Sequence, residues 1–191
     1  MAEITEYRGQ KLSSTDDSQE NAINGPQYVN IQEYRLAVTG LVANPLSLTY
    51  EEAIGRHKSI QKVVRLDCVE GWGVTVLWEG IMVKDLLQPA GVKPEAKAVI
   101  FHCVDGYATA LPLQYLTGSD IILAHKANGI TLPPERGFPF HLVAESKWGY
   151  KWARWVAALE LTDKVDYRGY WEKRGYSNAG DLDKEFFDFD G

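Results

Sequence analysis

The pattern of hydrophobic and polar positions is clearest in residues 62–73, which read KVVRLDCVEGWG. From Val64 onward apolar and charged residues alternate, and alternation with β-branched side chains is typical of a strand with one buried face. Two glycines flank Trp72 and predict a sharp turn, because glycine tolerates backbone angles that other residues avoid. Cys68 lies where strand and turn meet, a place from which a rigid scaffold can direct the sulfur into a pocket.

The same kind of pattern predicts further short strands along the chain. Asp105-Gly106 and Asn128-Gly129 are hairpin-type turns that separate neighbouring strands. The expected strands cover residues 34–41, 98–104, 107–111, 121–125, 130–132, 140–144 and 155–161. Because these strands do not alternate regularly with helices, the pattern predicts an α+β, mainly β fold with mixed sheets and short helices.

Two short helices are expected between the strands. Thr49 and Glu52 form a capping-box pattern that opens the first helix, which we expect to end at Gly55. Apolar positions through residues 81–87 predict a second amphipathic helix, stopped within residues 89–91 by proline and glycine.

Length and polarity predict how the chain is divided. The chain has 191 residues and a 45% hydrophobic composition, which suffices for one substantial core. Residues 1–25 carry little apolar patterning, so we expect a polar N-terminal arm or a strap over the surface. Residues 26–191 are predicted to form a single domain, and the tail from Asp166 to be irregular chain laid over the core.

Net charge and hydropathy limit the classes of partner and the cellular compartment that we expect. The net charge is −6 and the isoelectric point is about 5.3, which argues against nucleic acid and against an anionic membrane surface. No apolar run approaches the roughly 20 residues that span a bilayer, and the polar start does not read as a secretory signal. The chain as given is expected to be soluble, and a leader removed beforehand would favour an extracytoplasmic location.

The role of Cys68 stays open on this pattern alone. Two cysteines, Cys68 and Cys103, are too few for a disulfide scaffold or an all-cysteine zinc site. A buried apolar filler is the simplest interpretation. A nucleophile would need a histidine base, and none is near in the sequence. A disulfide or redox-active dithiol with Cys103, or a thiolate ligand for a soft metal, would also be consistent with the pattern.

A basic cluster follows in the segment KWGYKWAR. Lys147, Lys151 and Arg154 lie within eight residues around a glycine, an arrangement that suits a phosphate group. Arg136 and His141 flank the preceding proline-rich turn and add two further anion contacts. On composition alone, a solvated basic surface is the simpler interpretation of the cluster.

Three segments together resemble the molybdopterin-dependent oxidoreductases of the sulfite oxidase fold. They are YRLAVTGLVANPLSL, RLDCVEGWGVTVLWEG and LPPERGFPFHLVAESKWGYKWARWV, and the resemblance covers about residues 26–175. Within that family, they look most like the catalytic subunits of periplasmic protein-methionine-sulfoxide reductases. Common nucleotide and hydrolase motifs, including G-x-G-x-x-G and H-E-x-x-H, do not occur.

The resemblance implies a molybdenum–molybdopterin cofactor, with Cys68 as the metal-ligating and catalytic residue. The family has a threonine where Cys103 stands and a lysine where Arg154 stands. The cofactor contacts that it implies are Cys103, Arg136, His141, Lys147, Lys151, Trp152, Ala153, Arg154 and Asn24, with Gln27 as a further candidate.

The turn after Cys68 bears on the direction of the reaction. Sulfite oxidases follow this cysteine with an arginine that helps to bind sulfite, whereas residues 69–73 here contain no arginine and one acid, Glu70. A carboxylate near the metal would repel sulfite. We therefore expect oxygen-atom transfer that reduces a small S- or N-oxide. The expected electron donor is external, such as a membrane haem or quinol-linked protein. The resemblance also allows a sulfite oxidase-like enzyme or a non-catalytic molybdopterin-binding module.

Overall fold

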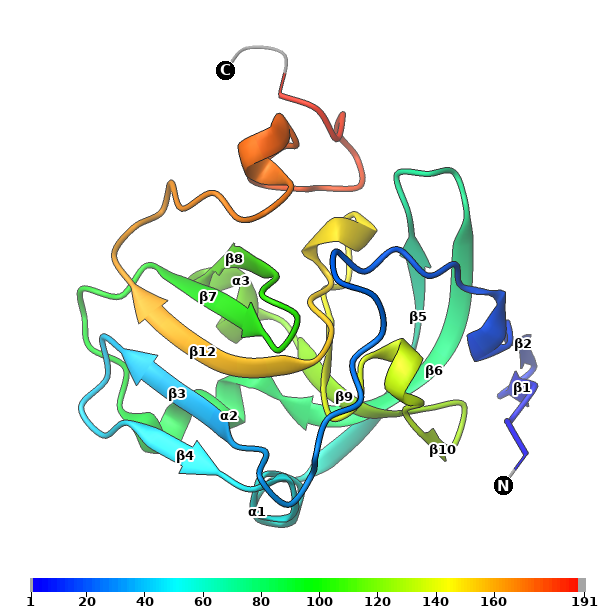
Figure 1. The fold of residues 1–191 in the computed structure, drawn as a ribbon, viewed down its shortest axis with the longest axis horizontal. Coiled ribbons are helices and arrows are strands. Elements are labelled where there is room, and N and C mark those ends of the chain that lie inside the picture. Colours follow the sequence, from blue (N-terminus) through cyan, green and yellow to red (C-terminus); the bar gives the residue numbers. More distant parts are fainter. Residues whose placement is uncertain (1, 189–191) are drawn as a thin grey trace.

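Two five-stranded sheets organise the chain, and the Cys68 strand belongs to the sheet on the right of Figure 1. The computed structural model describes residues 2–188. The first sheet runs in the order β10–β9–β6–β5, with β11 also paired to β9. Its strands are β5 (Ser59–Asp67), β6 (Gly73–Met82), β9 (Ile122–Ala127), β10 (Ile130–Thr131) and β11 (His141–Val143).

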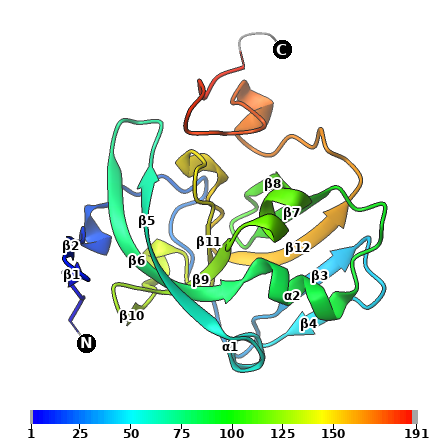
Figure 2. The same cartoon turned by 180° about the vertical axis from the view of Figure 1, so that it is seen from behind.

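The second sheet runs in the order β4–β3–β12–β7–β8 and mixes both strand directions, because β12 is parallel to β3 and antiparallel to β7. Its strands are β3 (Leu36–Gly40), β4 (Leu46–Leu48), β7 (Ala98–Cys103), β8 (Ala108–Pro112) and β12 (Val156–Thr162). The helices α2 (Val83–Ala90) and α3 (Leu113–Gly118) cover the face of this sheet that is turned away in Figure 1 and towards the viewer in Figure 2. The core is continuous across both sheets, with Val38, Phe101 and Leu123 fully buried.

These observations confirm the predicted fold class. The first helix, α1 (Tyr50–Arg56), has the predicted capping box: Glu52 N donates to Thr49 Oγ1 at 3.1 Å, and Thr49 N donates to Glu52 Oε2 at 2.9 Å. The helix passes through Gly55 and ends one residue later, at Arg56, so the expected end was one residue early.

The second predicted helix was wrong at its start. Ile81 and Met82 belong to β6, where they pair with Leu123 and Ile122 of β9. Cross-strand pairing in the buried sheet therefore overrides the local helical periodicity. The helix that follows, α2, ends at Ala90, and Gly91 caps it with a φ of +65°, the left-handed conformation typical of a helix C-cap.

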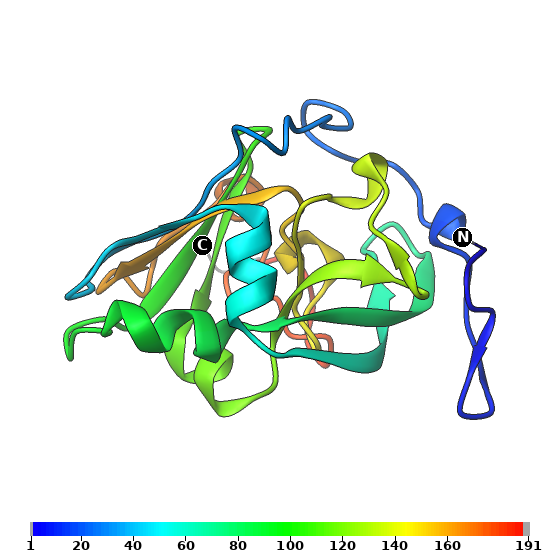
Figure 3. The same cartoon turned by 90° about the horizontal axis from the view of Figure 1, so that it is seen from below.

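The N-terminal residues form a hairpin and then a strap. The hairpin joins β1 (Glu6–Tyr7) to β2 (Gln10–Lys11) and projects from the body, as the blue segment in Figure 3 shows. The 3₁₀ turn η1 (Thr15–Asp17) follows, and the chain then passes over the front face of the molecule, from one sheet towards the other (Figures 1 and 3). The division of the chain at residue 25 remains a prediction. Within residues 2–188, no helix is long and apolar enough to cross a bilayer.

Three further 3₁₀ turns lie near the site described below. The proline-rich turn contains η2 (Pro134–Arg136), the basic segment contains η3 (Gly149–Lys151), and the tail contains η4 (Glu172–Arg174). The tail is otherwise irregular, as expected, and lies at the top of Figure 1.

Candidate active site

Cys68 directly follows β5 and begins the turn that the sequence predicted. Its N–H donates to Trp72 O at 2.8 Å, and Gly71 N donates to Cys68 O at 3.0 Å. Gly71 has a φ of +86°, which only glycine adopts at low cost. Gly149 of η3 packs against the same strand end, where an added Cβ would lie 3.5 Å from Cys68 Cα. The cysteine is thus 6% exposed and held between two glycine turns.

Two adjoining hollows meet at Cys68. Both are lined by Asn21, Cys68, Gly149, Trp152 and Arg154. One, here called the histidine hollow, also reaches Arg136 and His141 and encloses about 580 Å³, open solvent included. The other, here called the aromatic hollow, encloses about 670 Å³ on the same measure.

The histidine hollow contains buried polar atoms without a protein partner. His141 Nδ1 lies 2.9 Å from Arg136 O, which can only accept, so Nδ1 carries the proton and Nε2 has a free lone pair. Burial, together with the charges of Arg154 and Arg136, lowers the pKa of His141 to about 3. His141 Nε2 and Arg136 Nε are both buried without a hydrogen-bond partner. A buried unsatisfied acceptor and donor in one hollow indicate a polar ligand.

Arg154 and Trp155 are held in place around the two hollows. Gly137 has a φ of +105°, and a Cβ there would lie 3.1 Å from Arg154 Cβ, so the turn packs directly on the arginine. Trp155 adopts a φ of +53°, which is uncommon for a residue other than glycine. Its Nε1 donates to Pro134 O at 2.7 Å, and the Arg154 guanidinium lies 4.7 Å from its ring.

The Cys68 thiol is protonated in this environment without a metal. Burial is the main cause that raises the pKa of Cys68, and the charge of Glu70 adds to it. Cys68 Sγ is 3.6 Å from Glu70 Oε2 and 3.8 Å from Asn21 Nδ2. Metal coordination deprotonates such a thiol outright. Among residues 2–188, no group of three or more His, Cys, Asp or Glu side chains is placed to hold a metal.

The arrangement fits molybdopterin, which brings its own sulfur ligands to the metal. The protein would then need to add only one soft donor, and Cys68 provides it. His141 Nε2 can accept from an N–H group of the pterin ring, and Arg136 and Arg154 can bind its phosphate.

The structure does not bring all predicted contacts together. Cys68, Arg136, His141, Trp152 and Arg154 line the hollows. Ala153 is buried, and its carbonyl accepts from Leu142 N at 2.8 Å, so it positions its neighbours through the backbone.

The other predicted contacts lie elsewhere. Asn24 Nδ2 donates to Asp105 O at 2.6 Å, and Gln27 Nε2 donates to Gly25 O at 2.9 Å, so both amides have partners within the protein. Cys103 is buried at the end of β7 and is not among the residues that line the hollows. Cys103 and Cys68 are both free thiols, so they form no disulfide in this structure.

The two lysines of the basic cluster were expected at the phosphate, and the structure places them outside both hollows. Lys147 pairs with Asp181 of the tail. Lys151 pairs with Glu172 at 2.6 Å, and both side chains are fully buried. Because their charges are already compensated inside the protein, these lysines anchor the tail instead of facing a ligand.

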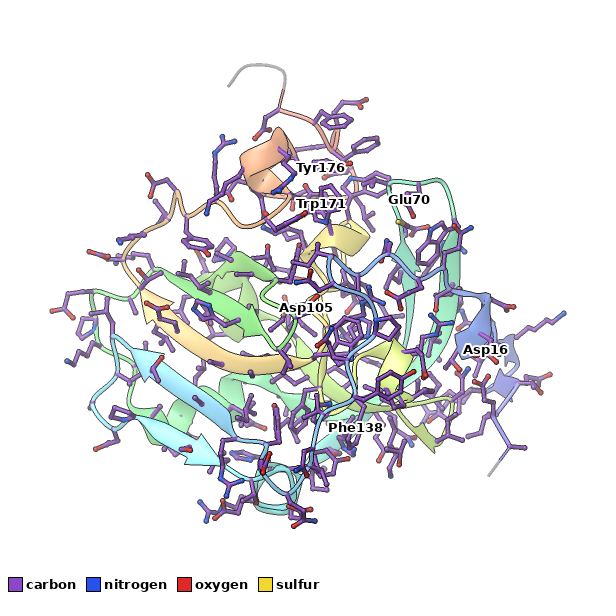
Figure 4. The ribbon with its side chains drawn as sticks, in the orientation of Figure 1. Asp16, Glu70, Asp105, Phe138, Trp171 and Tyr176 are labelled. Carbon is purple, nitrogen blue, oxygen red and sulfur yellow. The ribbon has the colours of Figure 1, made fainter. Side chains whose placement is uncertain are left out.

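Sequence reasoning missed residues from both ends of the chain. Glu20 and Asn21 of the strap bind the Arg154 guanidinium, and Asn21 also reaches the Cys68 sulfur. Trp171 and Tyr176 of the tail line the aromatic hollow (Figure 4). Four tryptophans, Trp148, Trp152, Trp155 and Trp171, cluster late in the sequence and were the only signal for the tail. The polar strap carried no such signal.

Fold and site together define a molybdenum enzyme of the sulfite oxidase fold. The fold is similar to the crystal structure of the sulfane dehydrogenase SoxCD from Paracoccus pantotrophus, with a TM-score of 0.71 and 26% sequence identity, over 81% of this chain and 43% of that chain.

The family follows from the sequence comparisons. The model of the oxidoreductase molybdopterin binding domain matches residues 23–171. The chain therefore belongs to this family of molybdopterin-dependent oxidoreductases.

Two curated relatives show how much of the chain is shared. The uncharacterized oxidoreductase YuiH of Bacillus subtilis is 36% identical over 159 residues, covering 82% of this chain and 78% of YuiH. The protein-methionine-sulfoxide reductase catalytic subunit MsrP of Gluconobacter oxydans is 29% identical over 147 residues, covering 68% of this chain and 47% of MsrP. The chain thus spans most of one relative and about half of the other.

Proposed function

We propose that the protein reduces a small S-oxide or N-oxide, with Cys68 as the protein ligand of the molybdenum. The observation that carries the direction is the carboxylate of Glu70, which lies 3.6 Å from Cys68 Sγ. Sulfite would meet this negative charge at the thiolate, whereas a sulfoxide is neutral. The name of the sulfoxide reductase subunit that the chain resembles supports the same direction.

In the overall reaction, the S–O or N–O bond of the oxide breaks and the oxygen leaves as water. Two electrons and two protons are consumed for each oxide. When bound, the molybdenum cofactor supplies the oxygen-atom transfer and the change in oxidation state. The electrons come from a separate donor protein, for which a haem or quinol-linked membrane protein is the chemical class proposed.

The chain's own residues bind, orient and supply protons. When the cofactor is bound, Arg136 and Arg154 would hold its anionic end, and neutral His141 would orient the ring through Nε2. Glu70 Oε2 also accepts from Trp72 Nε1 at 3.0 Å, which fixes the carboxylate beside the sulfur. From there it can pass protons to the departing oxygen.

The test begins with protein purified from a host that makes the cofactor. We expect about one molybdenum and one pterin per chain, together with reduction of small sulfoxides or N-oxides by an artificial electron donor. Protein without metal and pterin would contradict the proposal, and turnover of sulfite alone would reverse its direction.

Cysteine variants test the ligand. Cys68→Ser should lose molybdenum or activity while the fold remains intact by circular dichroism. Cys103→Ala is the matched control, because this free thiol is similarly buried but lies outside the hollows. Full activity of Cys68→Ser, or equal losses in both variants, would contradict the role of Cys68.

A further inference from the structure

Several aromatic side chains line the aromatic hollow beside Cys68. Tyr107, Tyr150, Trp155, Trp171 and Tyr176 all line it. The Tyr176 ring contacts the Trp171 ring with centroids 5.3 Å apart and the Tyr150 ring with centroids 5.1 Å apart. The rings of Tyr150, Trp171 and Tyr176 therefore form one continuous wall.

Two carboxylates without ion-pair partners face the same hollow. Glu70 accepts from Trp72 Nε1, and Asp105 Oδ1 accepts from Tyr107 N at 3.0 Å. Among the residues that the structure describes, neither carboxylate forms an ion pair. Figure 4 shows Glu70 on the strand side of the site and Asp105 towards its centre. Asp105 is only 7% exposed, and burial raises its pKa because the charged form has lost water there.

The one arginine that lines this hollow is already neutralised. Arg154 Nη1 lies 3.1 Å from Glu20 Oε2, and Arg154 Nη2 lies 3.2 Å from Glu20 Oε1. If a cofactor phosphate displaces Glu20, the phosphate compensates the same charge. In either case Glu70 and Asp105 leave the aromatic hollow with an excess of negative charge.

We infer that the aromatic hollow is a subsite for an organic cation, so that the preferred oxide carries an ammonium group. This inference rests on the proposed function, because it names the substrate class of that site. Aromatic faces carry negative charge density and attract ammonium groups, most strongly where water is excluded. Carboxylates add a direct Coulomb attraction and repel anionic oxides.

The part of the wall that the tail contributes, Trp171 and Tyr176, is held in place by buried contacts. The family match ends at residue 171, so Tyr176 lies beyond it. The buried pair of Lys151 and Glu172 fixes the tail next to Trp171, and Lys151 Nζ also donates to Asn178 O at 2.9 Å. A subsite in this position can distinguish substrates without changing the metal ligand.

Binding can be measured apart from turnover. Calorimetry on the purified full chain would compare choline with its uncharged isostere, which has a tert-butyl group in place of trimethylammonium. We expect choline to bind about 3- to 30-fold more tightly, the range of cation–π energies in proteins. Equal affinities, or tighter binding of the uncharged isostere, would overturn the inference.

Variants locate the site. Asp105→Asn keeps the hydrogen bond to Tyr107 N and should remove most of the preference for choline, and Trp171→Leu should do the same by removing a ring. Glu51→Gln is the control, because Glu51 is exposed on α1. A preference that survives both Asp105→Asn and Trp171→Leu would overturn the placement.

Turnover separates this inference from the proposed function. Alkyl methyl sulfoxides of equal length would carry a terminal ammonium, methyl or carboxylate group. We expect the lowest KM for the ammonium sulfoxide, with similar kcat for all three, and Asp105→Asn should raise KM for that substrate alone. Equal KM values with active enzyme would refute the cation subsite and leave the proposed function standing. Choline binding to cofactor-loaded protein that reduces neither these sulfoxides nor the matching N-oxides would refute the proposed function alone.

Discussion

The carboxylate of Glu20 accepts two hydrogen bonds from the guanidinium of Arg154, with N–O distances of 3.1 and 3.2 Å. The two residues are 134 positions apart, and the contact fastens the N-terminal strap over the hollow that contains Cys68. Glu20 thus holds the guanidinium that is proposed to bind the cofactor phosphate. If Arg154 has that role, Glu20 of the strap and the phosphate compete for it.

Replacing Glu20 should therefore ease cofactor loading. In Glu20→Gln the guanidinium is no longer paired, so the cofactor should bind about two- to fivefold more tightly at limiting supply, as expected for loss of a partly exposed ion pair. The molybdenum content of protein from hosts with restricted cofactor synthesis would measure this. Glu33→Gln, at another exposed acidic position before β3, should leave loading unchanged. Equal or lower loading in Glu20→Gln would show that the strap does not compete.

The buried imidazole of His141 should make stability fall in acid. Its folded-state pKa of about 3 lies below the usual 6.5, so the unfolded chain binds the extra proton first as the pH falls. The free energy of unfolding should decrease as pH falls from 6.5 towards 3, by about 2–3 kcal/mol at pH 4.5.

His141→Gln isolates this contribution because glutamine does not titrate. Urea unfolding at several pH values should show that the wild type loses stability relative to His141→Gln as the pH falls, while the nearby charges of Arg136 and Arg154 stay constant. A difference that does not change with pH would mean that folding does not lower the pKa of His141.

Glu70 gives the turn beside Cys68 a negative charge. Replacing it with a positive charge should alter which substrate the site accepts. Glu70→Arg places a cation on the turn that follows Cys68. We expect KM for sulfite to fall at least about tenfold, or sulfite turnover to become detectable, and KM for an ammonium-bearing sulfoxide to rise. Steady-state kinetics with both substrates would measure this, and Glu70→Gln should give intermediate values. Unchanged sulfite kinetics would remove the charge argument for the direction of the reaction.

Local patterns predicted the elements that depend on local chemistry. The strand before Cys68, the turn at Gly71 and the capping box of Thr49 and Glu52 each follow from residues within a few positions. The predicted start of α2 was wrong because the apolar periodicity around Ile81 suits a helix. In the structure Ile81 pairs with Leu123 of β9 and belongs to a strand. Non-local hydrogen bonds leave no trace in a local window.

Cys68, Arg136, His141 and Arg154, which the resemblance named as cofactor contacts, line one hollow. Their roles toward the cofactor remain a prediction. Lys151 looked like an anion contact because its partner, Glu172, lies 21 residues later. From the sequence alone, the charge of Lys151 could pair with a ligand or with another residue. Only the position of the tail shows that its partner is Glu172.

The buried ion pair of Lys151 and Glu172 holds the tail against the body of the protein. Lys151 and Glu172 are both fully buried, and Thr109 Oγ1 donates to the same carboxylate oxygen at 2.5 Å. Lys151→Met would leave Glu172 as an uncompensated buried charge and should cost about 3–5 kcal/mol in the free energy of unfolding.

The double variant Lys151→Met with Glu172→Leu should recover most of this loss, since an apolar pair of similar volume is often neutral. Lys84→Met is the control, because its pair with Asp120 is exposed and should contribute at most about 1 kcal/mol. Urea unfolding would measure all three variants, and quenching of tryptophan fluorescence would report whether Trp171 has left the hollow. A loss for Lys151→Met no larger than that for Lys84→Met would show that the pair does not hold the tail.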